Sequence, residues 1–181
     1  MYRNRQELDC RWRFPQALAM KKRDLVFRGL KQGDFGWLVQ MHGELNARDE
    51  DFDITFEAPV AQILADFVRH HDPAFERGWI VERNGQRLGS IFCTREDGTV
   101  ARLRLFLLLP ETRGFGFGRS MLLHCMDFAR SKGYRRMVLW THKSHEAACA
   151  LYRKTGFRLM DEAEGREFGV DVVSQNWEIH L

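Results

Sequence analysis

Three glycines stand at every second position behind an arginine in the segment "ETRGFGFGRS", residues 111–120. Glycine allows positive φ angles and a close approach of the backbone to a ligand, and Arg113 adds a charge that can neutralise phosphate. An apolar run precedes the segment and a helical pattern follows it, so free N–H groups at a helix start attract an anion here. Gly114, Gly116 and Gly118 therefore predict a turn that binds a pyrophosphate.

Two familiar phosphate-binding patterns do not fit this turn. A Walker A loop ends in Gly-Lys-Ser/Thr, whereas Gly118 is followed by Arg119 and Ser120. A dinucleotide fingerprint needs a glycine at 119 or 121, where Arg119 and Met121 stand. ATP and NAD are both disfavoured. A turn that needs tight geometry without a ligand remains the alternative.

The cysteines give no pattern for metal binding. They are widely scattered, with no Cys-x-x-Cys pair and no histidine at zinc-ligand spacing: Cys10, Cys93, Cys125 and Cys149. We expect reduced thiols and no metal.

Length and composition favour one soluble domain. The chain has 181 residues, 44% hydrophobic and 29% charged, close to the averages for soluble globular proteins. No apolar run is long enough to span a bilayer, and the N-terminus lacks the features of a secretion signal. We expect a cytoplasmic protein with no membrane partner.

Positive charge is concentrated at the N-terminus. The formal net charge is +3, but residues 1–24 carry seven lysines and arginines against three carboxylates, which leaves residues 25–181 at 3 − 4 = −1. We interpret residues 1–24 as a basic, solvated extension. Contact of this extension with nucleic acid or anionic lipid is the less favoured alternative, and no nucleic-acid partner is expected.

The first half of the chain predicts the elements that lead up to the glycine turn. A strand lies within 25–30, and Asp34 can cap a helix that carries apolar residues at helical spacing. A second helix runs from about Thr55 and ends by Pro73. Asn84-Gly85 between two apolar runs predicts a hairpin over 79–93, and a turn at 96–98 leads into a strand over 100–110 that enters the core.

The second half continues the alternation of helices and strands. A helix over 120–133 has one apolar face and stops at Gly133; its buried face is expected at Met121, Leu122, Cys125, Met126 and Ala129. A strand over 136–140, a helix over 144–156 and strands over 157–162 and 175–181 complete the chain. This order predicts an α/β domain with a mixed sheet.

Two segments carry a resemblance to one family. "LFLLLPETRGFGFGRSML" resembles the acyl-CoA-binding segment of the Gcn5-related N-acetyltransferases (GNAT), whose Arg/Gln-x-x-Gly-x-Gly/Ala pattern is matched by Arg113, Gly116 and Gly118. "HEAACALYRKTGF" resembles the family's second signature, Asn-x-x-Ala-x-x-Leu-Tyr-x-Lys-x-Gly-Phe, with His145 in place of the asparagine. A narrower likeness over residues 25–181, in segments such as "FGWLVQMHGEL" and "NWEIHL", is to the acetyltransferase half of MarR-type regulator fusions, without the regulator.

The resemblance implies a fold and a cosubstrate. The fold is a single GNAT-like α/β domain, with a mixed, mostly antiparallel sheet flanked by helices, in which the fourth strand has a bulge and splays from the fifth. Acetyl-CoA lies in that gap, and the N-acetyltransferase domain covers 25–181. The implied CoA-binding residues are Phe106, Leu107, Leu108, Arg113, Gly114, Phe115, Gly116, Phe117, Gly118, Arg119, Ser120, His145, Ala148 and Tyr152.

The resemblance also implies an activity, acetyl-CoA-dependent transfer of an acetyl group to a primary amine of a small molecule or a protein lysine, by direct attack in a ternary complex. Tyr152 is implied as the general acid, because its counterpart lies near the CoA sulfur; the alternative is an aromatic residue that only packs the helix. Glu57 and His42 are candidate bases, with a helix-dipole carboxylate and a half-buried histidine as the alternatives. Dimers are common in the family. The rival function is a non-catalytic acyl-CoA sensor or interaction module.

Overall fold

Seven strands form one sheet in the part of the chain that the computed structural model describes, residues 25–181. Their order across the sheet is β1-β2-β3-β4-β5-β7-β6, and the β4–β5 pair is parallel while the other pairs are antiparallel. The predicted mixed, mostly antiparallel sheet is confirmed. The strands are β1 (Val26–Arg28), β2 (Arg77–Arg83), β3 (Gln86–Arg95), β4 (Val100–Leu108), β5 (Arg136–His142), β6 (Arg158–Glu167) and β7 (Val170–His180).

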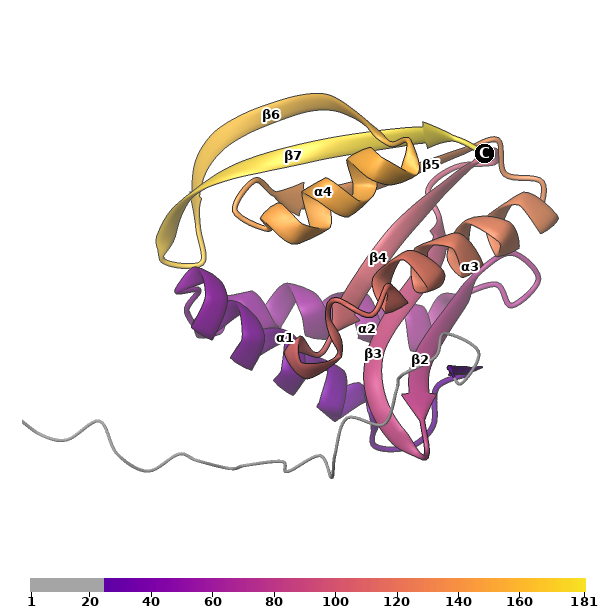
Figure 1. The fold of residues 1–181 in the computed structure, drawn as a ribbon, viewed down its shortest axis with the longest axis horizontal. Coiled ribbons are helices and arrows are strands. Elements are labelled where there is room, and N and C mark those ends of the chain that lie inside the picture. The colour runs from indigo at the N-terminus through magenta and orange to yellow at the C-terminus, as the bar shows by residue number, and fades with distance from the viewer. Residues whose placement is uncertain (1–24) are drawn as a thin grey trace, which may run out of the picture.

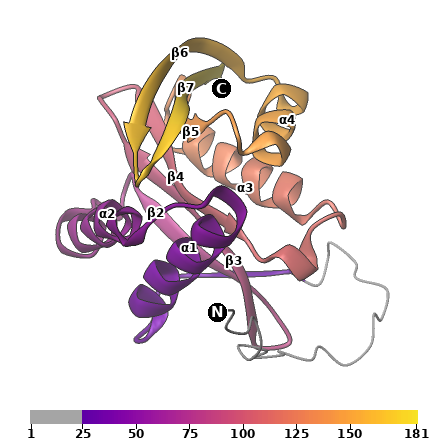
Figure 2. The same ribbon diagram turned by 90° about the vertical axis from the view of Figure 1, so that its left-hand side faces the viewer.

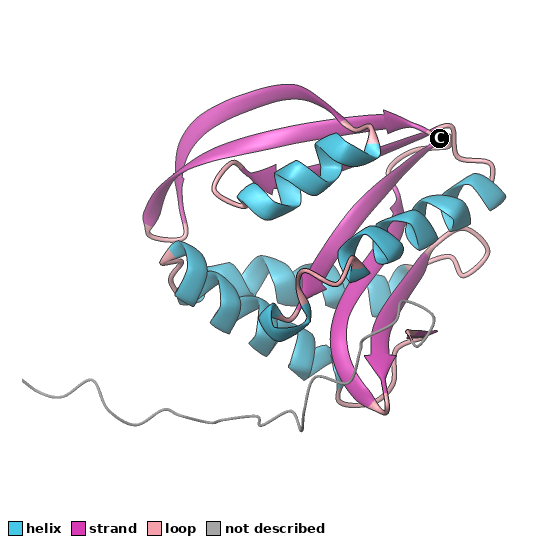
Figure 3. Cartoon of the chain, viewed as in Figure 1, coloured by secondary structure: helices cyan, strands magenta, loops and turns pink. Residues whose placement is uncertain are grey.

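Helices cover both faces of this sheet, as Figure 1, Figure 2 and Figure 3 show. On one face lie α1 (Asp34–Glu50) and α2 (Glu57–His70), and on the other lie α3 (Phe117–Ser131) and α4 (Glu146–Thr155). Short 3₁₀ turns at Ile54–Phe56 and Pro110–Thr112 precede α2 and the glycine turn.

Alternation along the strands builds a separate core on each face. Trp79 and Val81 of β2 pack in the core under α3 and α4, whereas Ile80 between them packs in the core under α1 and α2. Successive strand residues point to opposite faces, so one apolar run serves two helix layers. The five residues predicted for the buried face of α3 are all buried: Met121, Leu122, Cys125, Met126 and Ala129.

The predicted hairpin and helix stop are present. Asn84 and Gly85 join β2 to β3 with φ angles of 50° and 75°, the left-handed pair that a tight two-residue hairpin requires. Gly133 follows α3 with a φ of 83°. Glycine is favoured there because it enters the left-handed region without steric cost.

The fourth strand carries the expected bulge. Ser90 of β3 pairs with Leu107 and Phe92 pairs with Arg104, so two residues of β4 stand opposite one residue of β3. Leu105 within this interval has a φ of 47°, an unusual value for a residue with a large side chain. The buried Ser90 hydroxyl donates a hydrogen bond of 2.7 Å to the Leu105 carbonyl oxygen and so satisfies the distorted backbone.

The bulge coincides with a separation of β4 from β5. The two strands pair only between residues 100–102 and 136–138, at their N-terminal ends. Beyond this short ladder they diverge, and Figure 1 shows β4 running away from β5 in a V. The predicted splay of the fourth and fifth strands is confirmed.

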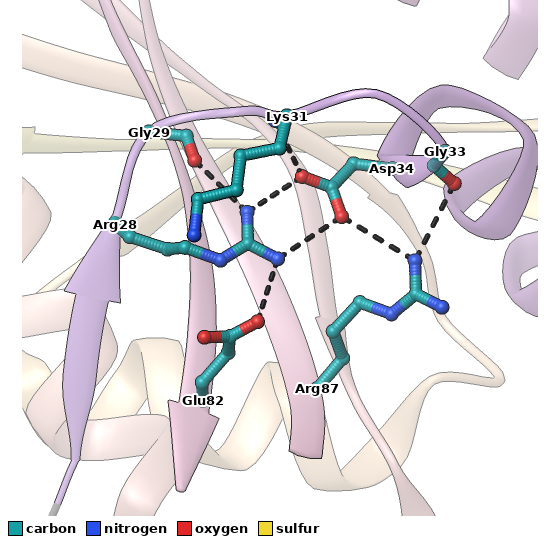
Figure 4. Close-up of polar contacts among 7 residues, drawn as sticks. All are labelled: Arg28, Gly29, Lys31, Gly33, Asp34, Glu82 and Arg87. Atoms are coloured by element: carbon teal, nitrogen blue, oxygen red, sulfur yellow. Dashed lines mark hydrogen bonds and ion pairs between the residues drawn. The ribbon is translucent and has the colours of Figure 1, made fainter. Parts of the chain in front are cut away.

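Asp34 does not cap α1, and this prediction was wrong. Gly33 occupies the cap position with a φ of 85°, and Asp34 is the first helical residue. Its buried carboxylate instead accepts hydrogen bonds of 2.6 Å from the Arg28 guanidinium and the Lys31 N–H, with Arg87 at 3.3 Å. Figure 4 shows this network, in which Arg28 also pairs with Glu82 of β2. The Asp34 carboxylate is therefore bonded to two arginines and is not available to accept hydrogen bonds from the first N–H groups of the helix.

The last two strands are longer than predicted. The predicted strands 157–162 and 175–181 are parts of a hairpin that turns at Phe168 and Gly169. The missed part of β6 is polar and exposed at the sheet edge, so it lacks the apolar alternation that marks a strand. Its backbone pairing with β7 and the bond from Asp53 N–H to Phe168 O hold it in place.

Candidate functional site

A cavity of about 1160 Å³ opens where β4 and β5 diverge. Its walls come from β4, the end of β5 and the helices on both faces of the sheet. The sequence-predicted residues that line it are His42, Phe106, Leu107, Leu108, Arg113, Gly114, Gly116, Phe117, Gly118, Arg119, His145, Ala148 and Tyr152. The splay therefore brings residues that are distant in the chain around one space.

The open edge of β4 presents backbone polar groups to this cavity. Leu109 N–H donates to Leu88 O at 2.8 Å, so the backbone of Leu109 faces β3. Backbone groups of neighbouring strand residues point in opposite directions, so those of Phe106 and Leu108 face the gap. Arg113 Nε donates to Leu108 O at 3.2 Å from that side. An extended ligand can therefore pair with β4 where β5 does not.

The glycine turn leads directly into α3. Gly114 and Gly116 have φ angles of 85° and 76°, which explains the glycines at these two positions. The Ser120 N–H donates to Gly116 O at 3.2 Å, so the earlier N–H groups of the helix, at residues 117–119, have no partner within it. Together with the helix dipole they form an anion-binding end.

Gly118 differs from the other two glycines of the turn, because its φ angle is not in the left-handed region. A Cβ atom placed on it would lie 3.4 Å from Leu151 and 3.8 Å from Leu108 and Phe106. A Cβ would therefore make ordinary van der Waals contacts with α4 and β4 here, and only a larger side chain would crowd this part of the cavity wall.

Three predicted residues near the turn differ in their placement. Arg113 lines the cavity and its NH1 lies 3.6 Å from Asp49 Oδ2 of α1. The Phe115 ring is exposed and packs against Phe117 with ring centroids 5.8 Å apart, outside the cavity lining. Ser120 is half-buried, and it too lies outside that lining.

Tyr152 of α4 is 5% exposed and lines the cavity opposite β4. Its ring centroid lies 6.3 Å from that of Phe106 and 5.7 Å from that of Phe157. Burial raises the pKa of the phenol well above its usual range, and Cys149 adds to the rise. The hydroxyl is therefore protonated at neutral pH and able to donate a proton.

His145 is held from both ring nitrogens at the start of α4. Nδ1 lies 3.2 Å from Thr141 Oγ1, and Nε2 lies 3.1 Å from Asn46 Oδ1 of α1 and 3.7 Å from Glu50. Burial lowers the pKa of His145, although the Glu50 carboxylate acts in the opposite direction. This histidine ties α4 to α1 across the cavity, and Ala148 follows it on the lining.

The two candidate bases lie in different surroundings. His42 is 7% exposed, lines the cavity, and its Nε2 has no hydrogen-bond partner among residues 25–181. Burial, with a contribution from His145, lowers the pKa of His42 to about 4. Glu57 is half-buried at the start of α2, packed so closely on Gly43 that a side chain there would overlap its carboxylate, and it is not part of the cavity lining.

An aromatic cluster on the other side of the cavity was not predicted from the sequence. Phe52 lies with its ring centroid 5.2 Å from that of His142 and 5.1 Å from that of Phe168, and Phe56 lies 5.0 Å from Phe168. His142 is almost fully buried at the end of β5, with Nε2 3.6 Å from a Glu167 oxygen. The only feature of the sequence that could have pointed to His142 as a site residue was its position at the end of an apolar strand.

The described residues include free thiols, but no cluster of metal ligands and no helix suited to span a membrane. No group of three or more His, Cys, Asp or Glu residues within 25–181 is arranged to hold a metal ion. Cys93, Cys125 and Cys149 are buried free thiols, and Cys10 lies outside the described residues. No helix within the described range is both long and apolar enough to cross a membrane.

Comparison with known proteins assigns the chain to one family. Residues 41–157 match the model of the acetyltransferase (GNAT) family. The uncharacterized N-acetyltransferase YjgM of Escherichia coli is 32% identical over 96 residues, which are 51% of this chain and 58% of that protein. The chain thus spans little more than half the length of this relative.

Solved structures share the fold at low sequence identity. A GCN5-related N-acetyltransferase from Kribbella flavida superposes with a TM-score of 0.72 at 20% identity, covering 89% of this chain and 100% of that one. The putative acetyltransferase yncA from Salmonella typhimurium, solved with acetyl-CoA, gives a TM-score of 0.65 at 17% identity and covers 87% of this chain and 94% of that one. These relatives are named as acetyltransferases or N-acetyltransferases, and the narrower likeness to MarR-type fusions stays a prediction.

Proposed function

The chain belongs to the acetyltransferase (GNAT) family, and from this premise we propose that it is an acetyl-CoA-dependent N-acetyltransferase that acts on a primary amine. The observation that carries the proposal is the meeting, in one cavity, of an unpaired β4 edge and the glycine turn at the start of α3. The acceptor is an amine of a small molecule or a protein lysine.

The cavity suits acetyl-CoA as cosubstrate. Its volume of about 1160 Å³ is ample for an elongated ligand. The N–H groups at residues 117–119 and the Arg113 guanidinium would hold the pyrophosphate, and the β4 backbone at Phe106 and Leu108 would pair with the amides of the pantetheine arm. The neighbour from Salmonella typhimurium carries acetyl-CoA, which supports this choice.

Acetyl transfer to an amine requires a neutral amine, polarisation of a thioester carbonyl, and a proton for the departing thiolate. Acetyl-CoA supplies the acetyl group as an activated thioester. A backbone N–H of the bulged β4 edge polarises the carbonyl, and the buried Tyr152 hydroxyl donates a proton to the sulfur. The amine attacks directly while both substrates are bound.

The base that receives the amine proton is His42 or Glu57. His42 has the stronger case, because it lines the cavity, is neutral at physiological pH, and has an Nε2 without a partner among the described residues. Glu57 would have to act through water from its position beside Gly43.

We propose that the active protein forms homodimers, as is common in the family.

Calorimetric titration with acetyl-CoA, together with a matched pair of glycine variants, tests the proposal. Gly116→Val places a branched side chain at the proposed pyrophosphate site, but it also strains a backbone with a φ of 76°. Gly133→Val introduces the same strain at a φ of 83° beyond the far end of α3. We expect wild type and Gly133→Val to bind acetyl-CoA and CoA alike, and Gly116→Val to lose binding.

Release of CoA thiol in the presence of a panel of amines then tests catalysis. Binding without thiol release for any amine would leave a non-catalytic acyl-CoA sensor as the function. Equal CoA affinity in all three proteins would refute the assignment of the turn.

A further inference from the structure

Arg104 lines the cavity from β4, and its side chain makes no hydrogen bond, ion pair or ring contact with any residue that the structure describes. Its side chain is half-buried. A partly desolvated cation without a partner costs free energy, so proteins normally pair such groups. An unpaired arginine inside a ligand cavity points to an anion that the ligand brings.

The neighbouring arginine shows the contrast. Arg102, two residues earlier on the same face of β4, donates from Nε and NH2 to both carboxylate oxygens of Glu96. Its charge is therefore matched within the protein. Burial lowers the pKa of Arg104, the like charge of Arg102 lowers it further, and Glu96 acts weakly in the opposite direction. No other carboxylate in residues 25–181 has a resolved effect on Arg104.

The position of Arg104 is suited to the acceptor. Ala101 and Leu103 pack in the core under α3, so alternation puts Arg102 and Arg104 on the α2 face of the sheet. The glycine turn and Tyr152 lie on the other face, and the cavity reaches both through the gap between β4 and β5. A ligand held by the glycine turn enters from one face, which leaves Arg104 for a second ligand that enters from the other.

Apolar and aromatic residues line the cavity on the face of the sheet that carries Arg104. Met137 and Leu139 of β5 pack in the core under α3, so alternation puts Trp140 on the same face of the sheet as Arg104, across the gap between the diverged strands. Trp140 is 40% exposed and lines the cavity together with Phe56, Pro59 and Ile63 of the α2 segment. An apolar group next to an anion would be accommodated here.

We propose that Arg104 binds a carboxylate of the acceptor, so that the acceptor is an amine that also carries a carboxylate, such as an α-amino acid with an apolar side chain. This inference rests on the proposed function and narrows its substrate class. A carboxylate fits better than a phosphate, because one guanidinium without a partner matches one negative charge, and Arg102 is already engaged by Glu96. The planar guanidinium can bind a carboxylate through two parallel hydrogen bonds.

Matched pairs of acceptors test the proposal. Initial rates of CoA thiol release are measured at saturating acetyl-CoA with L-phenylalanine and with L-phenylalaninamide, and then with other α-amino acids and their carboxamides. We expect kcat/KM to favour the carboxylate of each accepted pair by roughly 10- to 100-fold, the usual effect of a hydrogen bond to a charged group. A larger fraction of the amine is neutral in the carboxamide than in the amino acid, so amine protonation alone would favour the carboxamide, the opposite of the expected preference.

Variants connect the preference to this residue. Arg104→Gln is expected to abolish the preference by raising the KM of the carboxylate acceptors, and Arg104→Lys to restore part of it. Arg130→Gln is the control, because Arg130 is an exposed residue of α3 that pairs with Asp127 away from the cavity. It should keep the wild-type preference.

The possible results separate this inference from the proposed function. Turnover of amines with no preference for the carboxylate, or an undiminished preference in Arg104→Gln, overturns the inference and leaves the acetyltransferase in place. Without turnover of any amine, the proposed function fails, and calorimetric titration of N-acetyl-L-phenylalanine in the presence of CoA decides the inference. Binding that weakens in Arg104→Gln supports it, and equal or absent binding in both proteins overturns it.

Discussion

At the scale of single residues, burial determines which protonation state each candidate catalytic group holds. Tyr152 is 5% exposed and its pKa is raised, so the phenol keeps its proton throughout the neutral range. His42 is similarly buried, but burial favours the neutral form of an imidazole, and its pKa falls to about 4. At neutral pH the phenol therefore carries its proton and the imidazole does not, and these are the starting states that a general acid and a general base require.

Replacing Tyr152 with phenylalanine tests the acid role, because it removes the hydroxyl and keeps the ring that packs near Phe106 and Trp177. We expect kcat to fall by about 100-fold or more, the usual contribution of a general acid, with the Kd of CoA nearly unchanged. Steady-state rates and calorimetry measure the two quantities. Wild-type activity should also show no decline from Tyr152 ionisation between about pH 6 and 9, because its pKa is raised. Undiminished kcat in Tyr152→Phe would leave the residue a packing role only.

At the scale of the elements, the charge network at the start of α1 fixes the helix that carries His42 and Asn46. Burial alone would raise the pKa of Asp34, but hydrogen bonds from Arg28 and the Lys31 N–H outweigh it, so that the pKa is lowered. A carboxylate whose pKa is depressed on folding stabilises the fold above its unfolded value of 3.8 and loses this contribution as the pH falls below that value.

Asp34→Asn is expected to lower the free energy of unfolding by about 1–3 kcal/mol at neutral pH, because Arg28 then keeps only Glu82 as a charged partner. Chemical denaturation measures this loss. Arg87→Gln is the control, since its contact with Asp34 is longer, at 3.3 Å, and its side chain is 35% exposed. It should cost less than about 1 kcal/mol. Equal losses in the two variants would contradict a central role for the Arg28–Asp34 pair.

The elements also show what local sequence patterns can predict. Asn84-Gly85 and the apolar face of α3 depend on nearby residues, and both predictions are confirmed. The middle of β6 could not be predicted, because an exposed edge strand has no buried face and depends on pairing with β7. Asp34 was misread because its partners Arg28 and Arg87 approach only after the strands fold.

In the candidate site, too, some residues could be predicted from local sequence and others could not. The glycine turn and Tyr152 could be singled out because they lie in two short signatures that resemble those of a family, and the structure places both on the cavity wall. Arg104 and His142 were missed, because their place in the cavity depends on the β4 bulge and on where β5 leaves its neighbour. These are properties of the sheet that no short segment encodes.

At the scale of the whole molecule, buried histidines from different elements make stability depend on pH. His42 of α1, His142 of β5 and His145 at the start of α4 surround the cavity, and the rings of His142 and His145 lie 5.6 Å apart. Burial lowers the pKa of all three in the folded protein. The unfolded chain therefore binds protons to these residues at a higher pH than the folded protein does.

We expect the free energy of unfolding to be highest above about pH 6.5 and to fall as the pH is lowered toward 4, where His42 itself titrates in the folded state. The shift of His42 from 6.5 to about 4 corresponds to a contribution of up to about 3 kcal/mol. Urea denaturation at a series of pH values measures the curve, and His42→Gln should flatten it over this interval. His180→Gln, at an exposed position near the C-terminus, should leave the slope of wild type. Parallel curves for wild type and His42→Gln would mean that His42 binds its proton equally well in the folded and unfolded chains, and would contradict the lowered pKa that burial gives it.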